Sequence, residues 1–375
     1  MADDGRSVLV AGAGPTGLSA ALELCRRGIM PRIVDSEAGP APMRESRALG
    51  VNARTLTLLS ASGVSDRILA AAMSIPHFRV YSGSRLLMDI RTSDVRGAYN
   101  AIYALPQGHT ERLLLARLED YGVRPEWNTK LETVSGDPAR PQVTLRRPDG
   151  GSEDVVTDVV IGAEGAHSEV RRALHLGFPG EQVETCFYLA DYRYEQPLDD
   201  RDARVRLFNP GVLGHLPLAP DALRYISTLA DYEARIEHPG KVAELLWKSE
   251  FRVHFRHVGE MARGNIFLAG DAAHIHSPAG ARGMNLGIED ACWLAYLIAE
   301  RRESEYSALR MPAVHQVMEM TRRLTALITM QHPASIGIRN VLVPMAFRIP
   351  PLGKRLLRSV AGYDTPPPPW IAGAE

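Results

Sequence analysis

The chain has 375 residues, of which 45% are hydrophobic and 23% are charged, and its formal net charge is −1. This composition is ordinary for a soluble globular protein, and the length suffices for two or three domains. Without a basic surplus we expect neither nucleic-acid binding nor stable membrane association. Three cysteines without a C-x-x-C pair, and an acidic N-terminus, favour a cytoplasmic location.

The first elements form a β-α-β unit. Residues 7–11 (SVLVA) are predicted to be a buried parallel strand, and an amphipathic helix follows the turn GAGPTG. A second strand, in residues 31–36 (PRIVDS), ends at Asp35. This order predicts a doubly wound nucleotide-binding fold.

The glycines between strand and helix are spaced as G-x-G-x-x-G. Gly12 permits the tight turn, Gly14 lets a pyrophosphate approach the backbone, and Gly17 allows close packing of helix and strand. The N-terminus of the helix attracts phosphate, and Asp35 is placed to accept hydrogen bonds from ribose hydroxyls. The pattern therefore predicts dinucleotide binding, with a purely structural turn as the alternative. It does not separate NAD from FAD.

The middle of the chain alternates between helical and strand patterns. Residues 46–70 and 110–121 are predicted to be helical, and residues 75–90 have the β-branched and aromatic content of strands. Residues 181–258 predict a mixed or antiparallel sheet. Helices then follow to about residue 362, before a proline-rich tail.

These patterns predict an α/β fold with three parts. A discontinuous nucleotide-binding domain is interleaved with a sheet-based substrate domain, and helices follow both. The predicted ranges are 1–70, 100–180 and 259–300 for the first domain, 71–99 and 181–258 for the second, and 301–375 for the C-terminal helices and tail.

Residues 264–291 carry a second glycine-rich turn. Asp271 directly follows the strand NIFLAG, and AGARGMN opens an apolar helix. A nicotinamide nucleotide needs one glycine turn, whereas a second one far along the chain suits the longer FAD. Asp271, His274 and His276 could alternatively ligate a metal. Because nothing in the sequence is clearly placed to complete such a site, we expect no metal and assign the histidines to structural hydrogen bonds.

Three segments resemble the fingerprints of the class A FAD-dependent aromatic hydroxylases, the para-hydroxybenzoate hydroxylase-like flavoprotein monooxygenases. They are GAGPTG, DVVIGAEGAHSEVRR and GNIFLAGDAAHIHSPAGARGMNLGIEDA, and they span almost the whole chain. The resemblance implies a Rossmann-like FAD-binding domain, an interleaved β-sheet substrate domain and C-terminal helices.

The resemblance also implies roles for individual residues. Asp271 would hold the ribityl chain, Pro278 would lie beside the flavin ring, and the backbone at 283–285 would contact the pyrimidine edge. The expected cofactor-binding residues are Gly12, Gly14, Pro15, Thr16, Gly17, Asp35, Ser36, Arg44, Arg47, Gln107, Asp271, Gly283, Met284 and Asn285.

Two positions depart from the family pattern. Glu164 replaces the usual aspartate of the second fingerprint, which leaves pyridine-nucleotide use open. Arg282 stands in the second glycine-rich turn, AGARGMN (residues 279–285), which we call the flavin loop. Many relatives have glutamine at this position. Arg282 would either stabilise the negative charge of the reduced flavin or be a solvated surface arginine.

The chemistry implied by the resemblance is hydroxylation of an aromatic or polyketide-like molecule. NADPH or NADH would reduce FAD, and O₂ would react to form a flavin hydroperoxide. A base is expected but not identified, and His215 and Tyr225 are candidates for the substrate pocket, or else packing residues. A Baeyer–Villiger enzyme, an oxidase or a non-catalytic dinucleotide-binding protein remain alternatives. We expect a monomer or homodimer.

Overall fold

A five-stranded sheet lies at the centre of the part of the chain that is predicted to bind a nucleotide, called below the nucleotide-binding part. The computed structural model describes residues 5–43, 48–330, 332, 337 and 350–371. The sheet has the order β17-β18-β11-β1-β2, and all neighbours are parallel except β17. Its strands are β1 (Val8–Ala11), β2 (Arg32–Val34), β11 (Val159–Gly162), β17 (Ala262–Arg263) and β18 (Ile266–Leu268).

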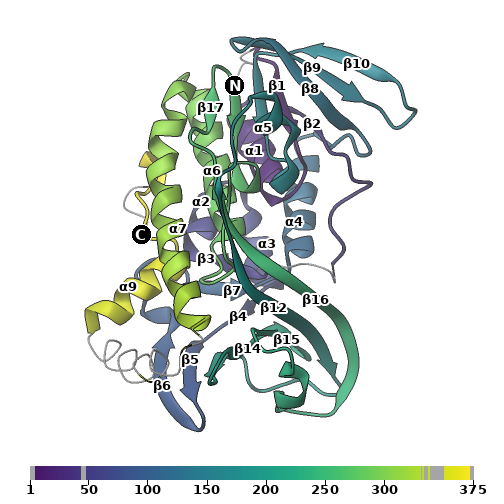
Figure 1. The fold of residues 1–375 in the computed structure, drawn as a ribbon. Coiled ribbons are helices and arrows are strands. Elements are labelled where there is room, and N and C mark those ends of the chain that lie inside the picture. The colour runs from purple at the N-terminus through teal and green to yellow at the C-terminus, as the bar shows by residue number, and fades with distance from the viewer. Residues whose placement is uncertain (1–4, 44–47, 331, 333–336, 338–349, 372–375) are drawn as a thin grey trace.

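Long helices cover this sheet (Figure 1). Helix α1 packs against both α4 and α6, and α6 packs against α7. Pro15 begins α1, where a missing N–H is harmless, and Leu18 and Leu22 are fully buried. The helices are α1 (Pro15–Arg26), α4 (Gln107–Glu119), α6 (Gly283–Ala299) and α7 (Tyr306–Ile328).

A second sheet has eight strands in the order β19-β16-β12-β15-β14-β13-β5-β6. Its pairs are antiparallel except β13 with β5, so the sheet is mixed, and the predicted fold class is confirmed. The strands are β5 (His77–Ser82), β6 (Arg85–Arg91), β12 (Gly180–Tyr194), β13 (Ala203–Leu207), β14 (Val212–Ala219), β15 (Ala222–Ser227), β16 (Val242–His257) and β19 (His274–Ile275).

The two faces of this sheet have different neighbours. On the inner face, Leu216 and Leu218 share an apolar cluster with Ile102 and with Ala281 of the second glycine turn. Side chains alternate along a strand, so the residues between them point to the other, outer face. The inner face is therefore the one directed toward the nucleotide-binding part.

Residues 46–70 differ from the predicted single helix. Gly50–Asn52 form strand β3, and α2 (Ala53–Leu59) begins after Asn52, whose side chain caps it by accepting from the Thr55 N–H. Gly63, with φ of 78°, separates α2 from α3 (Val64–Ala71). A capping side chain and a left-handed glycine thus break the helical pattern.

The remaining elements are short. A three-stranded sheet of β8 (Lys130–Asp137), β9 (Arg140–Arg146) and β10 (Ser152–Val156) projects at the upper right of Figure 1. Strand β3 pairs with β7 (Ile102–Ala104), which also pairs with β4 (Met73–Ser74). Helix α5 (Glu169–Ala173) follows β11, and α9 (Pro350–Val360) lies near the C-terminus.

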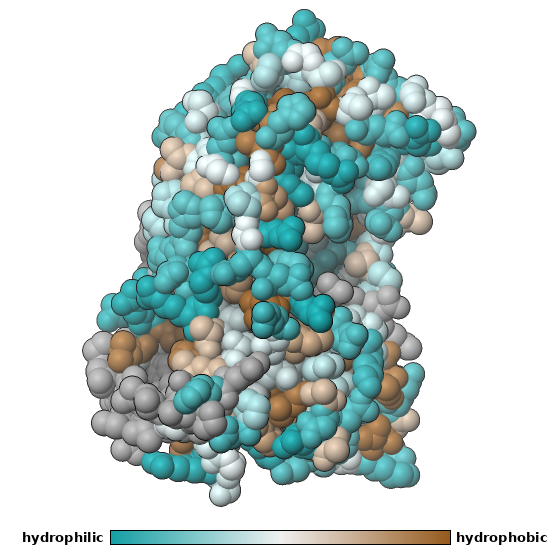
Figure 2. All heavy atoms as spheres, viewed as in Figure 1, coloured by the Kyte–Doolittle hydropathy of each residue, from teal (hydrophilic) through white to brown (hydrophobic). Residues whose placement is uncertain are grey.

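The surface in Figure 2 is mainly hydrophilic, with apolar residues scattered in small groups. Within the described ranges, no helix combines the length and the apolar character needed to cross a membrane.

Candidate functional site

The first glycine turn is fixed by close backbone contacts. A Cβ on Gly12, whose φ is 102°, would lie 2.3 Å from the Ala163 carbonyl oxygen, and one on Gly17 would lie 1.8 Å from the Gly12 oxygen. A Cβ on Gly14 would meet no atom within 4 Å. Two glycines are therefore required by packing, and Gly14 keeps open the face that a pyrophosphate would approach.

Asp35 braces this turn from the end of β2. One carboxylate oxygen accepts from the Ala13 N–H at 2.5 Å, and the other accepts from the Glu37 N–H at 2.8 Å. Each oxygen can accept a second hydrogen bond, so the carboxylate can still bind ribose hydroxyls. Ser36, next to it, is exposed.

Thr16 joins the first glycine turn to the third fingerprint. A Cβ on Gly270 or on Gly287 would lie 2.5 Å from the Thr16 hydroxyl oxygen. Gly270 has a φ of 61° and opens the short turn that contains Asp271, and Gly287 lies in α6. The two segments are therefore in direct contact although they lie far apart in the sequence.

The N-terminus of α6 carries free backbone donors. Among the described residues, the N–H groups of Gly283, Met284 and Asn285 have no hydrogen-bond partner. Ala281 holds the preceding turn in a left-handed conformation with a φ of 53°. Free donors at a helix N-terminus suit the oxygens and partial negative charge of a flavin pyrimidine edge.

The Asn285 side chain fixes this turn. Its amide nitrogen donates to the carbonyl oxygens of Gly50 and Ala281, at 2.8 and 2.7 Å. Its amide oxygen accepts from the Asn52 N–H at 3.0 Å and the Thr55 hydroxyl at 2.7 Å. The side chain is saturated by protein partners, so only the backbone of Asn285 is available to a cofactor.

Asp271 presents an unpaired carboxylate. Its side chain is exposed, and it makes no hydrogen bond or ion pair within the described part of the chain. Although solvent reaches the side chain, the protein packed around it desolvates the carboxylate in part and raises its pKa, and the nearby His274 opposes that rise. A carboxylate at the end of β18 without a protein partner is suited to accept ribityl hydroxyl hydrogen bonds.

His274 belongs to a buried network of charges. Its Nε2 lies 2.6 Å from the carboxylate of Asp290, which also pairs with Arg310 at 2.8 Å. Arg310 also donates to Glu289 at 2.7 Å, and Arg54 lies 3.5 Å from that carboxylate. All five side chains are at most 2% exposed. The sequence pattern did not reveal this network.

The histidines do not form a metal centre with Asp271 in the described structure. Nδ1 of His276 lies 3.0 Å from the Ser277 carbonyl oxygen, and desolvation lowers the pKa of His276 to about 4. Within the described ranges, no group of three or more His, Cys, Asp or Glu side chains is arranged to hold a metal ion.

Arg282 is buried, so the surface interpretation of this residue is wrong. It is 1% exposed, and its Nη1 lies 2.6 Å from a carboxylate oxygen of Asp364. The same nitrogen donates to the carbonyl oxygen of Ser359. Both partners lie near the C-terminus, so the positive charge beside the α6 N-terminus is paired. Pro278, earlier in the turn, is exposed.

The second fingerprint contacts the third through Arg171, which donates to the Ala272 carbonyl oxygen at 2.9 Å. Glu164 accepts from the Ser168 hydroxyl at 2.5 Å and from the first N–H groups of α5. Burial raises the pKa of Glu164, and these hydrogen bonds oppose the rise. The Glu164 side chain thus caps the N-terminus of α5.

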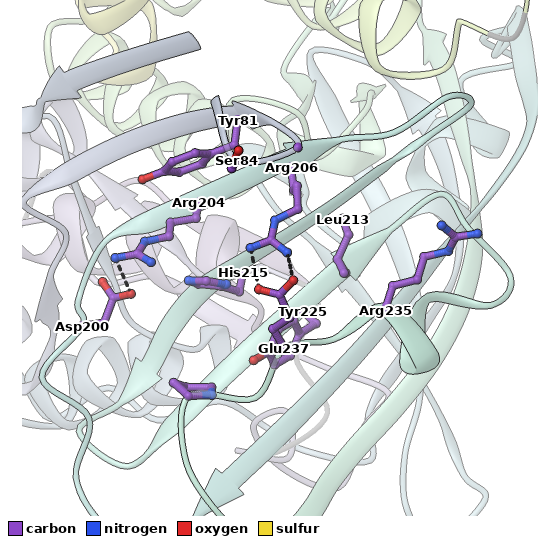
Figure 3. Close-up of a pocket in the computed structure, with 12 residues that line it drawn as sticks. Tyr81, Ser84, Asp200, Arg204, Arg206, Leu213, His215, Tyr225, Arg235 and Glu237 are labelled. Atoms are coloured by element: carbon purple, nitrogen blue, oxygen red, sulfur yellow. Dashed lines mark hydrogen bonds and ion pairs between the residues drawn. The ribbon is translucent and has the colours of Figure 1, made fainter. Parts of the chain in front are cut away.

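His215 and Tyr225 do not face the flavin loop. They are paired across β14 and β15, in alternation with Leu216, and Tyr225 packs in the outer-face cluster with Tyr192 and Tyr232. Both line an outer cavity of about 280 Å³ (Figure 3). Desolvation lowers the pKa of His215 to about 4. Strand alternation thus puts His215 and Tyr225 on the face opposite Leu216, and a role for them in substrate binding stays a prediction.

By the family resemblance, Gln107, Arg44 and Arg47 would contact the FAD phosphates or the ribityl chain. Gln107 begins α4 and donates to the buried Glu111 at 2.8 Å. Arg44 and Arg47 lie outside the described residues. Pro15 and Thr16 occupy the first turn of α1, beside the open face of Gly14.

The chain matches a known domain family and several known proteins. A family model described as an FAD binding domain matches residues 6–209 and 220–321. The 6-methylpretetramide 4-monooxygenase of Streptomyces rimosus is 35% identical over 384 residues, covering 95% of this chain and 66% of the relative. The pentachlorophenol 4-monooxygenase of Sphingobium chlorophenolicum is 30% identical, with 86% and 65% covered.

A solved structure agrees with these relatives. The anhydrotetracycline hydroxylase OxyS from Streptomyces rimosus has a TM-score of 0.78 and 27% identity, covering 97% of this chain and 77% of that one. The chain spans about two thirds of the length of the two sequence relatives above. With the fingerprints joined at one site, these similarities establish that the chain belongs to the class A FAD-dependent aromatic hydroxylase family.

Proposed function

We propose that this protein is an FAD-dependent monooxygenase that takes electrons from NADPH or NADH and hydroxylates an aromatic or polyketide-like small molecule with O₂. The observation that carries the proposal is the contact of Thr16 with Gly270 and Gly287. It brings the first glycine turn against the segment that holds Asp271 and α6. The open face of the first glycine turn at Gly14 and the free N–H groups that open α6 then suit the two ends of one long cofactor.

The residues present fit FAD. The first turn of α1 would bind the diphosphate, Asp271 would accept hydrogen bonds from the ribityl hydroxyls, and the backbone of 283–285 would bind the pyrimidine edge. When bound, FAD supplies the redox chemistry, accepting electrons from the nicotinamide and activating O₂. The protein's task is to orient the substrate ring and exclude water.

The inner face of the eight-stranded sheet is suited to that task. Leu216 and Leu218 offer an apolar surface next to Ala281 of the flavin loop. Arg224 and Asp191, paired at 2.7 Å on the same face, are buried polar groups. The names of the relatives support an aromatic or polycyclic substrate, since they specify 6-methylpretetramide, pentachlorophenol and anhydrotetracycline.

We further propose that the FAD-binding domain comprises residues 1–70, 100–180 and 259–300 and that the substrate domain comprises residues 71–99 and 181–258. Residues 301–375 would form the C-terminal part. A cytoplasmic location and a monomer or homodimer stay predictions.

A panel of phenols and polycyclic aromatics tests the function. A substrate should stimulate NAD(P)H oxidation and yield a product heavier by one oxygen atom, and Asp271→Ala should lose the stimulation at low FAD. A product that has lost two hydrogens, without added oxygen, would identify an oxidase instead. Protein that binds nucleotide but oxidises no NAD(P)H with any compound would contradict an enzymatic role.

A further inference from the structure

The C-terminal segment supplies the partners of the arginine in the flavin loop. Arg282 precedes the first residue of α6 and is buried against residues 359–364. One carboxylate oxygen of Asp364 lies 2.6 Å from Arg282, and the other accepts from the Ser359 hydroxyl at 2.6 Å. Both oxygens are engaged, so the carboxylate has a single defined orientation.

The segment is held in place independently of this ion pair. The Arg54 N–H donates to the Ala361 carbonyl oxygen at 2.9 Å, and the Arg54 guanidinium donates to the Thr365 carbonyl oxygen at 3.0 Å. Gly362 has a φ of 89°, and a Cβ there would lie 2.5 Å from the Arg54 Cβ. The backbone around Asp364 is therefore anchored to α2, and loss of the carboxylate charge alone should not release it.

The ion pair changes the charge that the loop brings to a bound flavin. The N–H groups of residues 283–285 and the partial positive charge of the helix terminus already favour an anion there. Arg282 alone would add a full positive charge, and reduced flavin is negatively charged. The negative charge of Asp364 offsets the positive charge of Arg282, and the ion pair keeps the Arg282 side chain in one position.

We propose that Asp364 is a positioning residue of the FAD site: it pairs with Arg282, fixes the flavin loop and holds down the reduction potential of the bound flavin. The proposal rests on FAD binding, and it does not depend on which substrate is hydroxylated. It extends the functional site to a segment about 80 residues beyond the flavin loop, since the two residues are 82 positions apart.

A double-mutant cycle tests it on the FAD-loaded protein. Asp364→Asn retains an oxygen that can accept from Arg282 but removes the negative charge. At a fixed solution potential, the ratio of reduced to oxidised flavin should rise by about fivefold, which corresponds to about 20 mV for a two-electron couple. Arg282→Gln should lower the ratio, and the double variant should return close to the wild-type value.

Asp231→Asn is the matched control. Asp231 is exposed and pairs at 2.7 Å with Arg235, which lines the outer cavity, so this variant should leave the flavin ratio unchanged. If Asp364→Asn lowers the thermal midpoint of the protein but does not raise the flavin ratio, the residue is only structural and the proposal is overturned. If Asp364→Asn does not fold, a double variant whose ratio equals that of Arg282→Gln would overturn it as well.

Discussion

The buried charge network between α6 and α7 makes Arg310→Met a demanding test of the fold. Arg310 pairs with Asp290 at 2.8 Å and with Glu289 at 2.7 Å. Burial alone would raise the pKa of Asp290, but the charges of Arg310 and His274 outweigh this and hold the pKa below its usual range. Arg310 is thus the main partner of two buried carboxylates.

The loss of stability in Arg310→Met depends on which partners the carboxylates of Asp290 and Glu289 keep. Asp290 would keep His274 at 2.6 Å and the Gly270 N–H at 3.2 Å. Glu289 would keep only two long contacts, Arg54 at 3.5 Å and the Thr365 hydroxyl at 3.3 Å. Methionine fills much of the space but brings no charge. Because loss of one partner from a buried ion pair costs about 3–5 kcal/mol, we expect the free energy of unfolding to fall by that amount.

Urea unfolding of the FAD-free protein, followed by tryptophan fluorescence, measures the change. The matched control is Arg323→Met on the same helix, where the arginine side chain is 73% exposed and pairs with Glu319. Exposed pairs contribute little, so the control should change the free energy of unfolding by no more than about 0.5 kcal/mol. If Arg310→Met costs as little as the control, the network does not stabilise the fold as described.

Three further predictions concern the site. Asp271→Ala should weaken FAD binding about tenfold to a hundredfold, from loss of roughly 1.5–3 kcal/mol of charge-assisted hydrogen bonding, and EDTA should leave the wild type active; metal-dependent recovery after EDTA would contradict this. Gly287→Ala should lower the free energy of unfolding by about 1–3 kcal/mol, because the added Cβ would lie 2.5 Å from the Thr16 hydroxyl oxygen. Adding Thr16→Ala should recover part of that loss, and no recovery would contradict the contact. Desolvation lowers the pKa of His276 from 6.5 to about 4, so between these pH values the unfolded chain binds a proton at this histidine and the folded protein does not. Below pH 6.5 the free energy of unfolding should therefore fall, by up to about 1.4 kcal/mol per pH unit, and less steeply in His276→Asn; parallel pH curves would contradict the assignment.

The sequence was sufficient where structure depends on neighbours along the chain. The apolar run, the glycine turn and helix α1 follow from local patterns, as do the strand before Asp271 and the turn that opens α6. The three fingerprints then linked distant segments by family resemblance. Their contact through Thr16 is visible only in three dimensions.

The sequence was insufficient where the partner is far away. Nothing local indicates that three of the four hydrogen bonds of the Asn285 side chain go to Gly50, Asn52 and Thr55, or that Asp364 pairs with Arg282. Alternation along β14 predicts that His215 and Leu216 face opposite ways, but not which face meets the flavin loop. That choice depends on how the two sheets pack.

The proposed function requires that oxygen from O₂ be transferred to an aromatic substrate at bound FAD. The most direct measurement is the mass of the product formed with NAD(P)H under isotopically labelled ¹⁸O₂, using any aromatic compound that stimulates NAD(P)H oxidation. We expect one labelled oxygen atom in the product. An oxidised product without the label, formed while labelled hydrogen peroxide accumulates, would contradict it.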